Sequence, residues 1–359
     1  MPGHARALLK GASRLALVLA YALLAFAAID LGYRVHSHRP VLVLDDWRLA
    51  RIQYLLFGER GMFHPVLGWV PRDEGERQVY NTLRFGVRRN FDEKGIRTGG
   101  ILAVGDVFTD GGTEVEDGET WPANLERLID APVINAGVAG YAVDQIALRA
   151  EQLLPLVRPK TLVVQLSEEA IARAGLSSFG RSKPYFSLDG DRLVYHPPVD
   201  AAAGADGVSG WRAKARTVLG HSAVLDVVLS RLAPVYWLGK SVEPITQQAD
   251  NDPWAIGCAL LQRLKRSAEQ NGAHLLVFLQ HQQRTVAEQA EPAGDARKLS
   301  ACAGAAGIEV VDQFQSLRAV VVADAGAFGH LYVQGDGLGE MSSAGNRRTA
   351  ELLARALNN

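Results

Sequence analysis

The sequence predicts an α/β fold: a doubly wound, mostly parallel five-stranded sheet of the flavodoxin-like kind, with an N-terminal membrane helix. Three observations predict it. Short runs rich in Val, Ile and Leu alternate with helical periods from residue 100 onwards, as strands buried on both faces of a parallel sheet do. A Gly-rich turn follows the first of these runs. An apolar segment with a basic flank stands at the amino end.

The amino end carries an unbroken apolar run over residues 15–29, preceded by Arg6, Lys10 and Arg14. This length fits the core of a signal peptide, for which Ala25-Phe26-Ala27 is a candidate cleavage site. Extended by a few residues, the run approaches the roughly 20 residues that span a bilayer. The basic flank favours an amino terminus inside the cell. We expect a single-pass anchor in the cell membrane, rather than a cleaved signal, with the bulk of the chain periplasmic or otherwise extracytoplasmic.

The predicted organisation has three parts. Residues 1–39 form a cytoplasmic stub and membrane anchor, or a signal sequence, and residues 40–99 form a lead-in that begins with a helix and continues irregularly. Residues 100–359 form the sheet domain, with an insertion at about 175–250. Within the insertion, residues 185–188 and 192–195 flank Asp189-Gly190-Asp191, which predicts a hairpin with an Asp-Gly turn. Residues 218–238 are expected to form one amphipathic helix.

The elements of the sheet domain follow from its periodicity. The expected strands are 101–104, 132–135, 161–166, 274–279 and 308–311, and the expected helices are 121–128, 143–154, 253–270, 287–303 and 342–357.

Charge and cysteine content exclude several classes of function. The 359 residues include 38 basic and 39 acidic ones, so we expect no nucleic-acid partner. The two cysteines exclude a disulfide scaffold, and the chain has no CxxC or His/Cys cluster with zinc-ligand spacing. We expect no metal and no cofactor. Cys258 and Cys302 are expected to stay unpaired. Their helices should run in the same direction, with one cysteine near the start and the other near the end, which separates the Cα atoms by more than ~7 Å.

Five further segments carry a family resemblance. They are Gly105 to Gly111 (GDVFTDG), His64 to Trp69 (HPVLGW), Val133 to Tyr141 (VINAGVAGY) with Asp144-Gln145, Lys183 to Phe186 (KPYF), and Asp336-Gly337 with Ser343 to Arg347 (SAGNR). With these segments the chain resembles the SGNH/GDSL hydrolase superfamily, and more closely its bacterial membrane-anchored members. The resemblance implies an SGNH fold with its ligand chemistry at the carboxyl edge of the sheet.

The catalytic positions of that family are not retained. Val107 stands at the position of the nucleophilic serine, and a valine has no group that can attack an ester. The position of the general base is Gly339 or Glu340, and Ser167 to Glu169 replace the segment with the oxyanion asparagine. Gly140 and Asp336 alone match. We therefore predict a degenerate site composed of Asp106, Val107, Gly140, Glu168, Asp336 and Glu340.

Two residues are candidate catalytic substitutes. Thr109 offers a hydroxyl two residues from Val107, although it is expected to serve the turn, and His281 follows a strand whose end faces the cleft. A lone histidine is more often structural than catalytic. The acidic residues of these loops either brace the turns and face solvent or form a site for a cation or for sugar hydroxyls. They are Asp106, Asp110, Glu168, Glu169, Asp336 and Glu340.

The resulting functional hypothesis is a membrane-anchored, catalytically degenerate protein that binds a glycan or acts as an accessory protein. What the resemblance implies is a role in cell-surface polysaccharide modification, with a membrane-bound acyltransferase as a candidate partner. The alternatives are an active esterase or O-acyl-transfer enzyme with a rearranged site, and a scaffold whose cleft is vestigial.

Overall fold

The computed structural model describes residues 2–37, 47–57, 61–75, 79–199, 210–238, 247–248, 252–333 and 340–358. The chain forms two compact units. One comprises Met1–Leu56 and Ala201–Val242, and the other comprises Phe57–Asp200 and Glu243–Asn359.

The first unit is helical. Its helices are α1 (Pro2–His36), α2 (Trp47–Phe57), α7 (Trp211–Gly220), α8 (Ala223–Leu232) and α9 (Pro234–Leu238). Within α1, the stretch Ser13–His36 has a mean hydropathy of 2.2 and is long enough to cross a membrane, a test that a signal sequence also passes. The single helix expected over 218–238 is wrong. Ser222 caps a new helix by accepting a hydrogen bond from the Leu225 backbone N–H, and Pro234 starts another.

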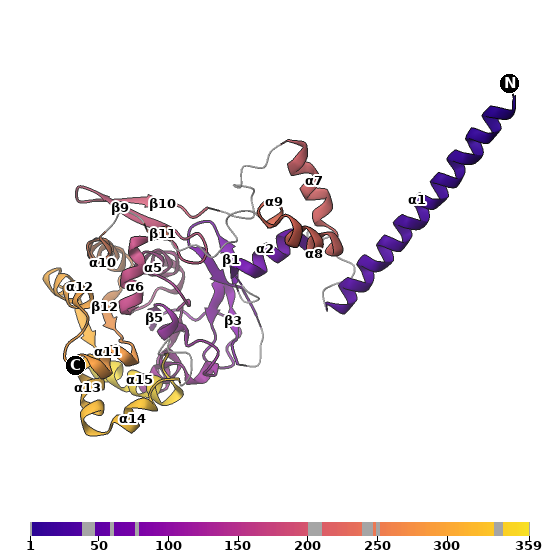
Figure 1. Ribbon diagram of the computed structural model, residues 1–359. Coiled ribbons are helices and arrows are strands. Elements are labelled where there is room, and N and C mark those ends of the chain that lie inside the picture. Colours follow the sequence, from indigo (N-terminus) through magenta and orange to yellow (C-terminus); the bar gives the residue numbers. More distant parts are fainter. Residues whose placement is uncertain are drawn as a thin grey trace. The chain divides into compact units, whose positions relative to one another are not determined.

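The second unit is built on one seven-stranded sheet with the order β13-β12-β7-β5-β6-β4-β3. Figure 1 labels β12, β5 and β3 of this sheet. Five strands are parallel: β5 (Ile101–Val104), β6 (Val133–Asn135), β7 (Thr161–Leu166), β12 (His274–Leu279) and β13 (Glu309–Asp312). These five follow the doubly wound order in which the first strand lies between the second and the third. The predicted α/β class and mostly parallel sheet are therefore confirmed.

Both faces of the parallel strands are apolar, which explains why the strands appear in the sequence as continuous runs. Leu102 and Val104 of β5 face α5 (Val143–Val157), α10 (Pro253–Gln270) and α12 (Gly294–Ala305). Ile101 and Ala103 face the opposite layer, where α4 (Trp121–Ile129) and α15 (Ser343–Leu357) pack together. Successive residues of a strand thus serve two different cores.

The lead-in contains short strands that the sequence did not predict. It contains the hairpin β1 (Gly61–His64) and β2 (Gly68–Pro71), and it adds the antiparallel strands β3 (Thr82–Leu83) and β4 (Val87–Arg88) to the sheet. The expectation of an irregular lead-in is therefore wrong. The predicted hairpin of the insertion is present as β9 (Tyr185–Asp189) and β10 (Arg192–His196). Asp189 pairs with Arg192 and belongs to the strand, so the loop is Gly190-Asp191. A further pair joins β8 (Leu176–Ser178) to β11 (Gln247–Gln248).

The remaining helices are short and cluster near the carboxyl ends of the strands. They are α3 (Val107–Asp110), α6 (Glu168–Ala172), α11 (Gln283–Glu288), α13 (Phe314–Ala323) and α14 (Ala325–Gly329), with 3₁₀ turns at Arg84–Gly86, Asp117–Glu119 and Arg173–Gly175. The single helix expected over 287–303 is instead two helices, α11 and α12. Pro292, just before α12, cannot occupy a helix interior, so the chain breaks there.

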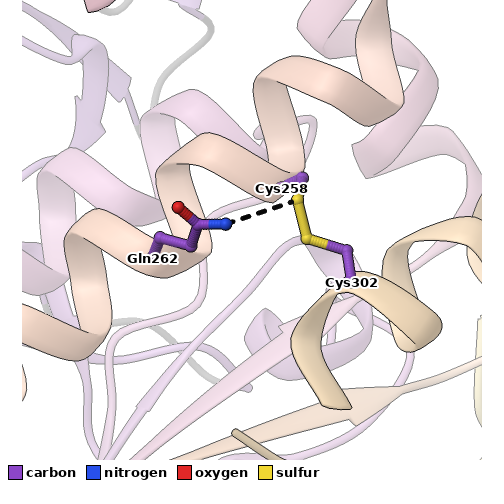
Figure 2. The surroundings of a disulfide bond; sticks show 3 residues. All are labelled: Cys258, Gln262 and Cys302. Carbon is purple, nitrogen blue, oxygen red and sulfur yellow. Dashed lines mark hydrogen bonds between the residues drawn. A yellow bond between two sulfur atoms is a disulfide. The ribbon is translucent and has the colours of Figure 1, made fainter. Parts of the chain in front are cut away.

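Cys258 of α10 and Cys302 of α12 form a disulfide, with Cα atoms 6.0 Å apart (Figure 2). The expectation that they stay unpaired is wrong. It assumed that the carboxyl ends of the two helices lie side by side, which would put the start of α10 far from the end of α12. Leu299 of α12 packs against Gly257, and Lys265 Nζ of α10 donates a 2.7 Å hydrogen bond to the Ala306 carbonyl just after α12. The end of α12 therefore lies beside the middle of α10.

Replacing both cysteines by alanine is expected to lower the free energy of unfolding of the sheet-containing unit by roughly 2–4 kcal/mol. The reason is that the bond joins residues 44 positions apart and restricts the unfolded chain. Gln262→Ala is the matched control, because Gln262 contacts Cys258 Sγ at 3.9 Å and its loss leaves the disulfide intact. Denaturant unfolding measures both variants. Two reactive thiols in the unreduced, denatured wild type would contradict the assignment.

Candidate functional site

The site is built on the turn that follows β5. Asp106 caps α3 by accepting a 3.1 Å hydrogen bond from the Phe108 backbone N–H, and Gly111 ends this single helical turn with a φ of 87°. Glycine adopts that left-handed conformation without steric cost. The turn places Val107 at the carboxyl edge of the sheet, where folds of this type hold their ligands.

Asp106 is fully buried and is held by polar neighbours. Its carboxylate accepts a 2.5 Å hydrogen bond from Ser167 Oγ, and Arg173 Nη1 lies 4.0 Å away. Burial raises the pKa of Asp106, while Arg173 and the hydrogen bond from Ser167 act in the opposite direction. The side chain of Ser167 is thereby committed to Asp106 and to capping α6, where it accepts a hydrogen bond from Ala170 N.

Next to the turn lies a cavity of about 280 Å³. Val107 lines it together with Val138 and Ala139, which follow β6. Gly140 is the next residue in that loop and has a φ of 80°. The remaining lining residues come from the lead-in, the loop after α3, the insertion and the segment before α15: Gly61, Trp69, Val70, Pro71, Tyr80, Asp110, Gly112, Thr113, Glu114, Arg181 and Glu340.

One wall of the cavity is the loop after α3, and buried Arg88 organises it. Nη1 of Arg88 donates to the carbonyls of Asp110 and Gly112 at 2.6 and 2.8 Å, and Nη2 donates to the Val115 carbonyl at 2.8 Å. The Asp117 carboxylate, 2.9 Å from Nε, balances the charge. The guanidinium therefore satisfies loop carbonyls that regular secondary structure leaves without partners.

Three segments that carry the family resemblance contact one another beside the cavity, which Trp69 and Ala139 line. Lys183 Nζ lies 2.6 Å from Asp144 Oδ2, and both side chains are fully buried. Gln145 Nε2 donates to the Leu67 carbonyl at 2.8 Å, and Trp69 Nε1 donates to the Ala139 carbonyl at 3.3 Å. These contacts hold the β1–β2 hairpin, the loop after β6 and the insertion against one another. The resemblance segments thus share a structural role beside the cavity.

Thr109, the first candidate substitute, is buried away from the cavity. Its hydroxyl donates a 3.0 Å hydrogen bond to Gln165 Oε1, which also accepts from the Asp106 backbone N–H. Among the described contacts of Thr109 Oγ1 there is no histidine. This geometry supports a role in the turn, because a hydroxyl nucleophile needs an adjacent base.

His281, the second candidate substitute, sits between two carboxylates. Nδ1 lies 2.6 Å from Glu168 Oε1, and Nε2 lies 2.8 Å from Asp312 Oδ1. Burial alone would lower the pKa of His281, but the two carboxylates outweigh it and raise the pKa to about 9. A protonated imidazole with both nitrogens engaged is not a general base at neutral pH. Its contacts tie together the ends of β7, β12 and β13.

The remaining predicted site residues come together only in part, since Asp110 and Glu340 both line the cavity. Glu340 lines the cavity, whereas Glu168 pairs with His281. Asp110 accepts a 2.6 Å hydrogen bond from Tyr80, and Glu169 is half-buried with its pKa raised by burial. Asp336 and Gly339 lie outside the described residues. Within the described ranges, no three His, Cys, Asp or Glu side chains are grouped to hold a metal ion.

Sequence reasoning missed three residues of this site. Tyr80 and Arg181 line the cavity, and Arg88 supports it. Arg181 lies over the Trp69 ring, with its guanidinium carbon 4.1 Å from the centroid, and burial lowers its pKa to about 10. These residues belong to the lead-in and the insertion, where no motif or periodicity marked them. A signal was available for Arg181 alone, as a basic residue two positions before the KPYF segment.

Comparison with known proteins gives similarity in solved structures only. No protein-family profile matches the chain, and no curated protein is similar to it. An acetyl xylan esterase shares 12% identity over 72% of this chain and 98% of its own, with a TM-score of 0.39. A lipase/acylhydrolase from Enterococcus faecalis shares 13% over 72% and 95%, with a TM-score of 0.39. A GDSL-like lipase from Bacteroides thetaiotaomicron shares 13% over 72% and 87%, with a TM-score of 0.35. Likenesses of this size say nothing about activity.

The His281 cluster predicts a stability that depends on pH. The pKa of His281 is about 9 in the folded chain and 6.5 for an ordinary histidine. Its contribution to stability is therefore fully present below about pH 6.5 and is lost as the pH rises through 9. We expect wild type to lose roughly 2–3 kcal/mol more than His281→Gln between pH 6 and pH 9.5. Parallel pH profiles of the two proteins in denaturant unfolding would contradict this.

Proposed function

We propose that this protein is a membrane-anchored, extracytoplasmic binding protein that holds an O-acylated glycan in the cavity beside Val107 without hydrolysing it. The observation that carries the proposal is the lining of the cavity. Val107 occupies the position at which the resembled SGNH/GDSL family has its serine, and the described lining contains no Ser, Cys or His side chain. Thr113 supplies the one aliphatic hydroxyl of the described lining, and no histidine lines the cavity to act as its base. A nucleophile paired with a base is the minimum that covalent ester hydrolysis requires.

The lining suits a small acylated sugar. Trp69 and Tyr80 supply aromatic surface, and Arg181, Asp110 and Glu340 supply charged and polar groups that can meet hydroxyl and carbonyl oxygens. A volume of about 280 Å³ lies just below the usual range for small-molecule pockets, about 300–1,000 Å³. One sugar unit with its acyl group is thus a reasonable occupant.

Two further observations support the proposed location. Ser13–His36 is long and apolar enough to serve as an anchor, and the Cys258–Cys302 disulfide is typical of an oxidising compartment. A protein placed there could present acylated glycan to, or receive it from, a membrane-bound acyltransferase. That partnership is the accessory role that the resemblance implies.

The first test measures hydrolysis. We expect no release of acetate from a chromogenic acetyl ester or an acetylated oligosaccharide by wild type or by Val107→Ser. The added serine would lack a base, and the oxyanion hole would lack its side-chain donor, worth ~10²–10³ in rate. Thr109→Ala is the control variant. Turnover by wild type that Thr109→Ala abolishes would establish a shifted nucleophile and overturn the proposal in favour of an active esterase.

The same preparations test binding by calorimetry. Trp69→Ala and Arg181→Ala should each weaken binding of the acetylated oligosaccharide by about tenfold, which corresponds to the loss of ~1.4 kcal/mol of contact energy. Trp254→Ala is the matched control, because Trp254 contacts Lys298 and does not line the cavity. No measurable binding by wild type, or equal loss in all three variants, would contradict the proposed site.

A further inference from the structure

In the helical unit, the start of α8 contacts the carboxyl-terminal part of α1. Asp30 Oδ1 accepts hydrogen bonds from Ser222 Oγ at 2.7 Å and from the Val224 backbone N–H at 2.9 Å. Arg34 donates to the other Asp30 oxygen at 2.8 Å and also to the His221 carbonyl. Asp30 directly follows the apolar run over residues 15–29. The start of α8 is therefore fixed at the level where α1 stops being apolar.

Two charged side chains of these helices, Arg216 of α7 and Asp226 of α8, point inwards. Asp226 is 2% exposed, and it accepts hydrogen bonds from Arg51 at 3.1 Å and from Trp237 Nε1 at 2.8 Å. Arg216 is likewise buried and donates to the Tyr236 carbonyl at 3.1 Å. These contacts connect α2, α7, α8 and α9 through charged and polar groups. The usual arrangement of a helix in water places such groups outside.

Several large apolar side chains of the same helices point outwards. Leu232 is 78% exposed and Trp211 is 74% exposed. We name the set to which they belong the outer face: Trp211, Lys214 and Val218 of α7, Val228, Arg231 and Leu232 of α8, and Val235 of α9. Within α7 the members are three, four or seven residues apart, and within α8 Val228 lies three and four residues before Arg231 and Leu232, so they share one side of each helix. Exposed apolar groups gathered this way indicate an interaction surface.

The charges of this segment fit an anionic surface. Residues 210–238 contain four basic residues, Arg212, Lys214, Arg216 and Arg231, and a single carboxylate, that of Asp226. Because Asp226 and Arg216 are buried, the exposed charges of the segment at neutral pH are all positive. Basic residues beside Trp, Val and Leu are typical of helices that lie in the headgroup region of a bilayer.

We infer that the outer face of α7–α9 docks on the lipid bilayer at the point where α1 leaves it. The occupant is an anionic lipid surface, because the face is continuous with a membrane-length helix and carries exposed basic and apolar groups together. The inference rests on the proposed role of α1 as a membrane anchor and is independent of what the cavity binds. Docking would place the indole of Trp211 among the lipid headgroups and upper acyl chains.

The test uses the full chain in nanodiscs of anionic lipid, with and without bromine on the upper part of the acyl chains. Subtracting the fluorescence of Trp211→Phe from that of wild type isolates the emission of Trp211. We expect brominated lipid to quench more than half of this difference emission. The double variant Val228→Glu/Leu232→Glu should remove most of the quenching, because it places carboxylates against an anionic surface.

Val322→Glu is the matched control, since Val322 of α13 is 77% exposed and belongs to the other unit. It should leave the quenching of Trp211 unchanged. A Trp211 emission unaffected by brominated lipid, in protein that co-elutes with nanodiscs, would overturn the docking and leave the anchor in place. Failure to co-elute with nanodiscs would overturn both. Neither result depends on glycan binding, so each is distinguishable from failure of the proposed cavity function.

Discussion

Buried cations that satisfy backbone carbonyls are the interaction on which the candidate site depends. The carboxyl edge of a parallel sheet ends in loops, and a loop packed against its neighbours must find partners for its polar groups. Arg88 provides them for the loop after α3, and Arg149 Nε donates to the Ala136 carbonyl at 2.7 Å in the loop after β6. Lys183 does the same for Leu176 and Pro184 while it pairs with Asp144. Removing one partner of such a buried pair typically costs ~3–5 kcal/mol.

In this arrangement, most of the residues that hold the shape of the cavity do not line it. The segments that resemble the SGNH/GDSL family meet beside the cavity through Lys183, Asp144, Gln145 and Trp69, and they hold its shape. Val107, the residue that the resemblance aligns with a catalytic serine, lines the cavity with an apolar side chain. His281 also has a structural role. Its two ring nitrogens contact the carboxylates of Glu168 and Asp312, and these contacts connect the ends of β7, β12 and β13.

The sequence predicted the parts of the fold whose signal is local and repeated. The five parallel strands were visible because each is apolar on both faces, whereas β3 and β4 span two residues each, too few for any period. The Cys258–Cys302 disulfide was missed because the level at which a helix ends depends on packing, here of Leu299 against Gly257. Val107 and Glu340 could be placed by motif. Tyr80 and Arg181 could not, because they reach the cavity from the lead-in and the insertion.

The most direct test of the account is hydrogen–deuterium exchange of the full chain with and without a partially acetylated oligosaccharide, followed by mass analysis of the sugar. Binding in the cavity should slow exchange in the peptides that cover 107–114 and 138–141, and the oligosaccharide should keep every acetyl group. Loss of acetyl groups, or protection confined to peptides away from the cavity, would contradict the claim that this edge of the sheet binds an acylated glycan without cleaving it.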